Sequence, residues 1–178
     1  MLPTHALSIA VLAGVALMSG CAATSYEQLV PSVKTDRPNH TAKSISVGSV
    51  TTSDQPDWNR VLANVSKETF REALIETLRR SQLFETVTSA PNGAYRLSAE
   101  IIAERMRGTF TNTISVFIRY ELELNGRLTW SENILSQGEL SPQDVLLGAE
   151  RHRKLQTDAF RDNLAELVEK LRAAIGEK

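Results

Sequence analysis

The sequence predicts an α/β (α+β) fold: a two-layer sandwich in which two long amphipathic helices pack on a mostly antiparallel sheet of about five strands, in the order β-α-β-β-β-β-α. Two long segments carry apolar residues at spacings of three and four, which predicts helices. The segments between them alternate apolar and polar residues, which predicts strands with one buried face.

The first strand is expected over residues 44–51 and the second over residues 83–88. Between them, Asp54, Pro56 and Asp57 favour a helix start, and the helix is expected to end near Gln82. Its apolar face is expected to comprise Trp58, Val61, Leu62, Val65, Thr69, Phe70, Ala73, Leu74 and Leu78.

The third and fourth strands are expected over residues 94–107 and 113–123, where the alternation is clearest. Phe117 interrupts the polar face of the fourth strand, and simple alternation places Ile102 and Met106 on the same face of the third. We expect these three residues to form an apolar patch that marks an interface, or else to lie under a further covering layer such as the N-terminal segment.

The Asn125-Gly126 pair predicts a hairpin. A two-residue turn would direct Trp130 to the polar face. We therefore expect a three-residue loop, 124–126, that pairs Leu122 with Leu128, Tyr120 with Trp130 and Glu123 with Arg127.

The fifth strand is expected over residues 127–136, and Ser141-Pro142 reads as a helix start. Gly148 separates this lead-in from the last helix, expected over residues 149–175. Its apolar stripe is Leu155, Ala159, Phe160, Leu164, Leu167, Val168, Leu171 and Ile175.

The N-terminus predicts an export signal followed by a lipid attachment site. Residues 1–20 contain no Lys, Arg, Asp or Glu, and their apolar run is too short for a comfortable membrane span. The sequence Met18-Ser19-Gly20-Cys21 then resembles the lipobox of bacterial lipoproteins, with Met18 where the family usually has Leu. The resemblance implies cleavage before Cys21 and a covalent diacylglycerol and N-acyl lipid on that residue, which is the only cysteine.

The same resemblance implies a location. Ala22 and Ala23 stand where an Asp would retain a Gram-negative lipoprotein at the inner membrane, so we expect the outer membrane, facing the periplasm. The expected organisation is a signal peptide over residues 1–20, a lipidated tether over 21–42 and a single α/β domain over 43–178.

Catalytic and metal-binding patterns do not emerge from the sequence. The histidines are His5, His40 and His152, which are too scattered to assemble a metal cluster with Cys21. No nucleophile turn, phosphate-binding glycine loop or dinucleotide fingerprint is present, so we expect no enzymatic activity and no cofactor beyond the lipid. A net charge of −1 gives no drive toward nucleic acid.

A basic run, Arg151-His152-Arg153-Lys154, is a second candidate interface, toward lipid head groups or an acidic partner, unless it is only a solvated helix face. The element order, with Arg79-Arg80-Ser81-Gln82-Leu83-Phe84 closing the first helix, resembles the lipopolysaccharide-assembly lipoprotein and the auxiliary lipoproteins of lipid-transporting ABC systems. This implies a non-enzymatic accessory subunit of an envelope complex. The alternatives are a lipid- or glycan-binding carrier and, third, a cell-envelope enzyme. Partner and oligomeric state are not predicted.

Overall fold

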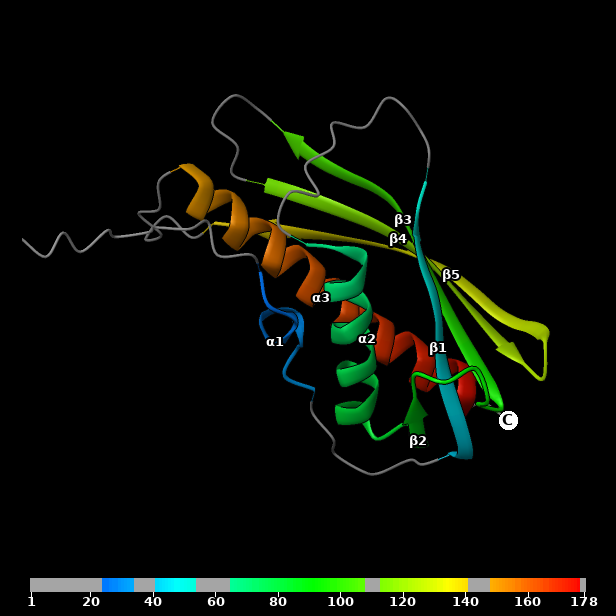
Figure 1. Ribbon diagram of the computed structural model, residues 1–178. Coiled ribbons are helices and arrows are strands. Elements are labelled where there is room, and N and C mark those ends of the chain that lie inside the picture. The colour runs from blue at the N-terminus through cyan, green and yellow to red at the C-terminus, as the bar shows by residue number, and fades with distance from the viewer. Residues whose placement is uncertain (1–23, 34–40, 54–64, 108–112, 141–147, 177–178) are drawn as a thin grey trace, which may run out of the picture.

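A computed structural model describes residues 24–33, 41–53, 65–107, 113–140 and 148–176 (Figure 1). Its elements are α1 (Tyr26–Leu29), β1 (Thr41–Thr52), α2 (Lys67–Ser81), β2 (Phe84–Thr88), β3 (Tyr95–Arg107), β4 (Thr113–Leu124), β5 (Arg127–Glu139) and α3 (Gly148–Gly176). The five strands form one sheet in the order β2-β1-β3-β4-β5.

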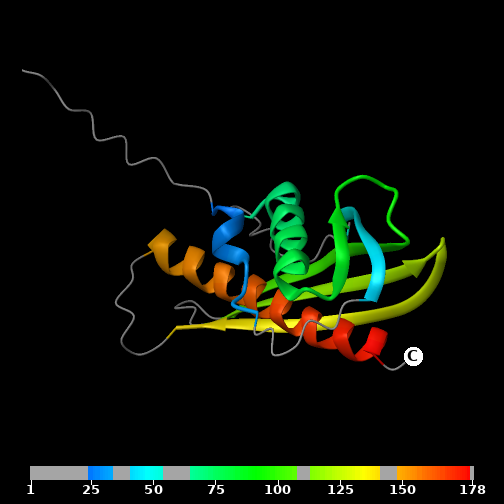
Figure 2. The ribbon, with the colours of Figure 1, turned by 90° about the horizontal axis from the view of Figure 1, so that it is seen from below.

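Helices α2 and α3 cover one face of this sheet, so the predicted fold class is confirmed (Figures 1 and 2). Strands β3, β4 and β5 form an antiparallel meander, as expected for consecutive hairpins. Strand β1 is parallel to both of its neighbours, β2 and β3. The parallel pairing with β2 follows from the helix α2, which carries the chain back between the two strands.

The chain crosses β1 between β2 and β3, and a glycine makes the crossing possible. A Cβ atom on Gly93 would lie 2.4 Å from the backbone nitrogen of Ser46, closer than side chains tolerate. The backbone of the next residue, Ala94, donates to Oγ of Ser44 at 3.1 Å. Arg71 of α2 fixes the same region by donating to the carbonyls of Val47, Gly48 and Ser89.

The core lies between the sheet and the helices. Phe70 of α2 and Phe160 of α3 meet with ring centroids 5.3 Å apart. The stripe predicted for α3 is confirmed, because Ile175 is partly buried and the other seven residues are fully buried. The core-facing positions predicted for β3 and β4 are buried there as well: Tyr95, Leu97, Ala99, Ile101, Ile114, Val116, Ile118, Tyr120 and Leu122. Ala103, predicted among them, is also buried, but it pairs with Phe117 and does not belong to this core.

Helix α2 begins later than the sequence predicts. Ser66 has an extended backbone, and its hydroxyl accepts a hydrogen bond of 3.0 Å from the backbone nitrogen of Thr69. This hydrogen bond caps the N-terminus of the helix, which therefore begins at Lys67. The prediction of a single helix from residue 54 to Gln82 is therefore wrong at its start. The first residues expected for that helix, 54–64, lie outside the described residues.

The predicted three-residue loop between β4 and β5 is also wrong. Asn125 and Gly126 both have positive φ, 51° and 78°, and form a two-residue turn that pairs Leu124 with Arg127. The register then shifts between Leu122 and Glu123, which brings Trp130 opposite Leu122. A bulge within β5 thus places Trp130 against the core, which the three-residue loop was expected to do. Leu128, which pairs with Glu123 before the bulge, is 59% exposed.

A second bulge, between Ile101 and Ala103 in β3, changes which residues of β3 lie opposite Phe117. Beyond it, Ala103 pairs with Phe117, and Met106 pairs with Ile114, whose side chain is buried in the core. The side chain of Met106, which belongs to the predicted patch, lies outside the described part of the chain. The bulge itself contains Ile102, which is partly exposed.

The N-terminal segment predicted as a tether is in part packed on the domain. Leu29 of α1 is completely buried, and Val30 is nearly so. Helix α1 contacts both α2 and α3 and lies on their side away from the sheet (Figure 1). The reason is that the few apolar residues of this segment cluster within one turn, and the groove between two helices can bury them. The folded unit therefore includes residues 24–33.

Candidate functional site

The sheet face opposite the helices is the candidate interaction surface, and the register defines its rows. Ala103, Phe117 and Leu135 are opposite one another on β3, β4 and β5. Phe117 is partly exposed, and Leu135 is 57% exposed. We call these three residues, together with Ile102 at the adjacent bulge, the open-face patch.

A polar row borders the open-face patch. Arg119, one step along β4 on the same face, donates through Nη1 to Oε2 of Glu100 at 3.2 Å and through Nε to Oδ1 of Asn133 at 3.3 Å. These contacts join β3, β4 and β5 across the face. The exposed ion pair between Arg119 and Glu100 contributes little to stability, but it limits the apolar area to one end of the sheet.

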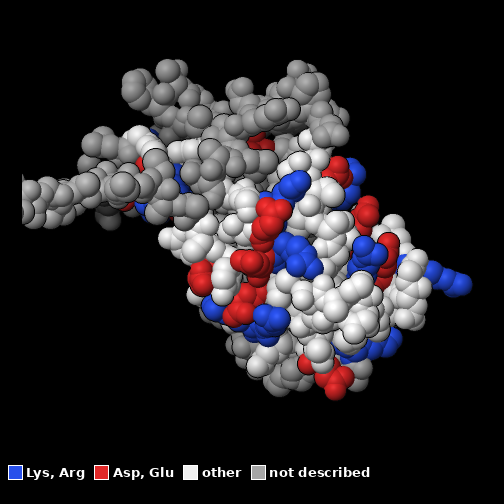
Figure 3. Space-filling view, in the orientation of Figure 1, with Lys and Arg blue, Asp and Glu red and all other residues white. Residues whose placement is uncertain are grey.

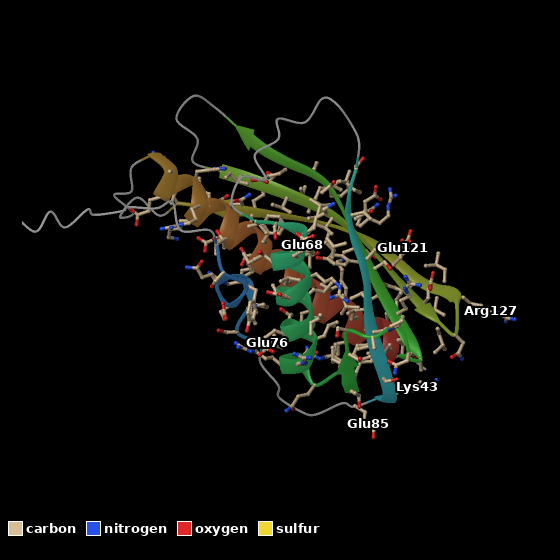
Figure 4. All side chains as sticks on the ribbon, in the orientation of Figure 1. Lys43, Glu68, Glu76, Glu85, Glu121 and Arg127 are labelled. Carbon is tan, nitrogen blue, oxygen red and sulfur yellow. The ribbon has the colours of Figure 1, made fainter. Side chains whose placement is uncertain are left out.

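The other exposed leucine, Leu128, lies near the hairpin at the far end of β5. Figure 4 shows Arg127, at the beginning of β5, on the side of the molecule opposite α1. Sequence reasoning missed Leu128 and Leu135 as surface residues. The local sequence Ile134-Leu135 gives no sign of which residue is buried, and only the register with Phe117 resolves it.

A buried carboxyl lies at the other side of the sheet, beneath α3. Glu104 is 6% exposed, and its Oε2 accepts a hydrogen bond of 3.0 Å from Nε2 of Gln156. Its Oε1 has no partner among the described residues. Burial raises the pKa of Glu104 to about 7, while the Gln156 hydrogen bond acts in the opposite direction. The β3 bulge explains why an acidic residue predicted for the polar face lies inward.

His152, one turn before Gln156 on α3, has both ring nitrogens buried without a hydrogen-bond partner among the described residues. Burial lowers the pKa of His152, so the neutral ring is favoured. Within the part of the chain that the structure describes, no group of three or more His, Cys, Asp or Glu side chains is placed to hold a metal ion. We therefore assign no metal centre to these residues.

The basic residues predicted as an interface lie on the first turns of α3. Arg151, Arg153 and Lys154 are all partly exposed, and Nζ of Lys154 lies 2.8 Å from Oδ2 of Asp158. In the view of Figure 3, acidic and basic side chains are interspersed over the described surface. Lys154 of this run is therefore paired with a carboxylate of α3 itself.

The lipidation candidate, Cys21, and the predicted signal peptide lie outside the described residues. Thr24, three positions after Cys21, is the first described residue and is 3% exposed. None of the described helices is both long enough and apolar enough to cross a bilayer.

Comparisons with known proteins show the fold. No family model and no curated protein matches the sequence. A DUF330 protein from Xanthomonas campestris is similar in structure with a TM-score of 0.64 and 12% identity, over 83% of this chain and 93% of that chain. An uncharacterized protein is similar with a TM-score of 0.55 and 14% identity, over 74% and 97% of the two chains.

A third structure, a hypothetical protein from Chlamydia trachomatis, is similar with a TM-score of 0.51 and 12% identity, over 76% of this chain and 96% of that chain. In each of these three comparisons, the other chain is covered almost entirely. The likeness is therefore one of whole domains.

Proposed function

We propose that this chain is a lipoprotein, anchored through Cys21 in the outer membrane and facing the periplasm, that serves as a non-enzymatic accessory subunit of an envelope assembly or transport complex. The observation that carries the accessory role is the open-face patch. Phe117 and Leu135 are neighbours on an exposed sheet face whose opposite face already packs on the helices. An apolar patch of this kind fits a protein partner.

The anchor rests on the lipobox sequence Met18-Ser19-Gly20-Cys21. Acylation with two or three chains holds a protein stably on a membrane, which a single chain does not. The structure supports a domain that stands without disulfides, because its core is built from interlocking apolar side chains of both helices and the sheet.

A lipid- or glycan-binding carrier is the alternative. Such a carrier needs a cavity of several hundred Å³ that the ligand can enter. In the described core, the space between helices and sheet holds fully buried large side chains, among them Phe70, Phe160 and Tyr120. This packing favours the accessory role.

Two measurements test the proposal in cells. The first is mass spectrometry of the mature N-terminus together with membrane fractionation, for the native chain and for Cys21→Ser. We expect acylated Cys21 in the outer-membrane fraction and a soluble Cys21→Ser variant. An unmodified Cys21 would refute the anchor.

The second measurement places a photo-crosslinking amino acid at Leu135, with a matched position at Glu169 on the exposed face of α3. We expect a discrete crosslink to an envelope protein from position 135 and none from position 169. Copurified lipid with no protein crosslink would favour the carrier instead.

A further inference from the structure

We infer that the domain is held directly against the bilayer by its α1 side, with the open sheet face directed away from the membrane. This inference rests on the proposed acylation of Cys21. The partner is the surface of the membrane that contains the protein's own lipid anchor. The surface of the domain that it meets comprises α1 and the adjoining parts of α2 and α3.

Only a short length of chain separates the anchor from the folded unit. Thr24 is already 3% exposed, and only three Cα-to-Cα steps separate it from Cys21. Three steps span at most about 11 Å whatever their conformation. A free tether of nineteen residues, by contrast, would average roughly 25 Å and reach much farther. The anchor is therefore at most about 11 Å from Thr24, which stands two residues before α1.

Helix α1 is fastened to the domain by burial and by hydrogen bonds. Leu29 is fully buried among the helices. The carbonyl oxygen of Gln28 accepts two hydrogen bonds from Arg161 of α3, from Nε at 3.1 Å and from Nη2 at 2.6 Å. Arg161 is in turn held by Asp158, whose Oδ1 lies 2.9 Å from its Nη1. The side-chain oxygen of Gln28 also accepts from the backbone nitrogen of Ser25, which closes the turn.

The surface around α1 belongs to the helix layer and not to the sheet. Helix α1 contacts α2, and Glu72 and Glu76 lie one turn apart on α2. Figure 4 shows Glu76 next to α1, whereas Glu121 lies on the opposite side of the sheet. Since α1 packs on the helix layer from outside, at least one helix diameter, about 10 Å, separates it from the sheet.

The consequence is a fixed presentation of the open-face patch. An anchor on the helix side turns Phe117 and Leu135 toward the periplasm, where a partner protein can reach them. A long flexible tether would leave every face of the domain equally accessible to the membrane and to partners. Packing of α1 on the domain removes this freedom of the domain to rotate relative to the membrane.

The test uses the full lipidated protein in vesicles of phosphatidylethanolamine and phosphatidylglycerol. Because an acylated Cys21 carries no free thiol, a single introduced cysteine is the only site for a membrane-impermeant fluorophore. One variant carries it at Glu72→Cys, beside α1, and the matched variant at Glu121→Cys, on the open face. Spin-labelled lipid head groups then quench whichever label lies near the bilayer.

We expect the label at position 72 to lose most of its emission and the label at position 121 to keep it. Adding Leu29→Asp, which expels α1 from its groove, should restore emission at position 72, while Glu27→Gln on the exposed side of α1 should not. Arg161→Gln provides a second route to release if Leu29→Asp lowers the thermal stability of the domain.

Equal quenching at positions 72 and 121, or quenching at position 72 that survives release of α1, overturns the inferred orientation while the anchor stands. A protein that does not float with the vesicles overturns both the anchor and the orientation. Flotation thus separates the failure of the two proposals.

Discussion

The phenolic hydroxyl of Tyr120 donates a 2.7 Å hydrogen bond to the side-chain oxygen of Asn163 in the core. The amide nitrogen of Asn163 donates to the carbonyl of Ile134 at 3.1 Å and to Oγ of Ser136 at 3.0 Å. Ser136 completes the set by donating to the carbonyl of Ala159 at 2.8 Å. This buried network joins β4, β5 and α3. The side chains of Tyr120, Asn163 and Ser136 all have hydrogen-bond partners in it, and a buried polar network with all its members paired favours a single packing arrangement.

Tyr120→Phe is expected to destabilise the protein by about 1–3 kcal/mol, because it leaves the buried Asn163 oxygen without its donor. Urea unfolding followed by circular dichroism measures the change. The ring remains, so the loss reports the hydrogen bond rather than a cavity.

A double-mutant cycle with Asn163→Leu separates the pair from its surroundings. Residues in one network couple by about 0.5–3 kcal/mol, so the double variant should lose less stability than the sum of the single variants. Additive losses would contradict the network.

The buried carboxyl of Glu104 predicts an unusual pH dependence. Burial raises the pKa of Glu104 from its ordinary 4.5 to about 7, so the folded chain holds its proton more tightly than the unfolded chain. The resulting stabilisation is complete below pH 4.5, declines as the pH rises and is lost above about pH 7. At about 1.4 kcal/mol per pKa unit, it amounts to roughly 3 kcal/mol at most.

Glu104→Gln should flatten this decline and should raise the free energy of unfolding at pH 8, because the neutral amide needs no buried charge. Thermal unfolding at several pH values between 4 and 8 checks the prediction. Glu121→Gln, an exposed change on the open sheet face, is the control and should leave the pH profile unchanged. The prediction fails if the two variants show the same profile.

Gly138 permits the close approach of β5 and α3. A Cβ atom at this position would lie 1.9 Å from the carbonyl oxygen of Leu155, which belongs to the helix backbone. Gly138→Ala must therefore push α3 away from the sheet, and overpacking of this kind costs about 1–3 kcal/mol or more.

Gly176→Ala is the matched control, because nothing lies within 4 Å of a Cβ atom there. Differential scanning calorimetry should show a clear loss of melting temperature for Gly138→Ala and little change for Gly176→Ala. Equal melting temperatures would show that α3 adjusts freely.

The sequence predicted the elements better than their register. The stripe of α3 from Leu155 to Ile175 repeats every three or four residues over many turns, so its buried face was unambiguous. In β3 and β5, one extra residue at each bulge reverses the faces beyond it, and alternation alone gives no sign of the reversal. This is why Glu104, expected on the polar face, lies inward instead.

The candidate surface was therefore only partly predictable. Phe117 was found because an aromatic residue interrupted a polar face, whereas Leu135 needed the pairing of β4 with β5. The docking of Leu29 was missed because four helical residues are too few to show periodicity. Long-range packing, rather than local propensity, decides both positions.

Leu135→Asp tests whether the open-face patch is functional rather than structural. The side chain is 57% exposed, so its replacement should change the free energy of unfolding by no more than about 0.5 kcal/mol. If a partner packs on Phe117 and Leu135, a carboxylate in the middle of the contact must be desolvated, and association should weaken at least tenfold, which corresponds to about 1.4 kcal/mol. Loss of the crosslink from a probe at the neighbouring position 117 measures this in cells.

Leu128→Asp is the matched change, since Leu128 is 59% exposed on the same strand but lies at the hairpin end, away from the patch. A contact centred on Phe117 predicts a strong effect at 135 and a weak one at 128. Equal effects would extend the interface along the whole of β5, and no effect at either position would remove the open face from the partner-binding role.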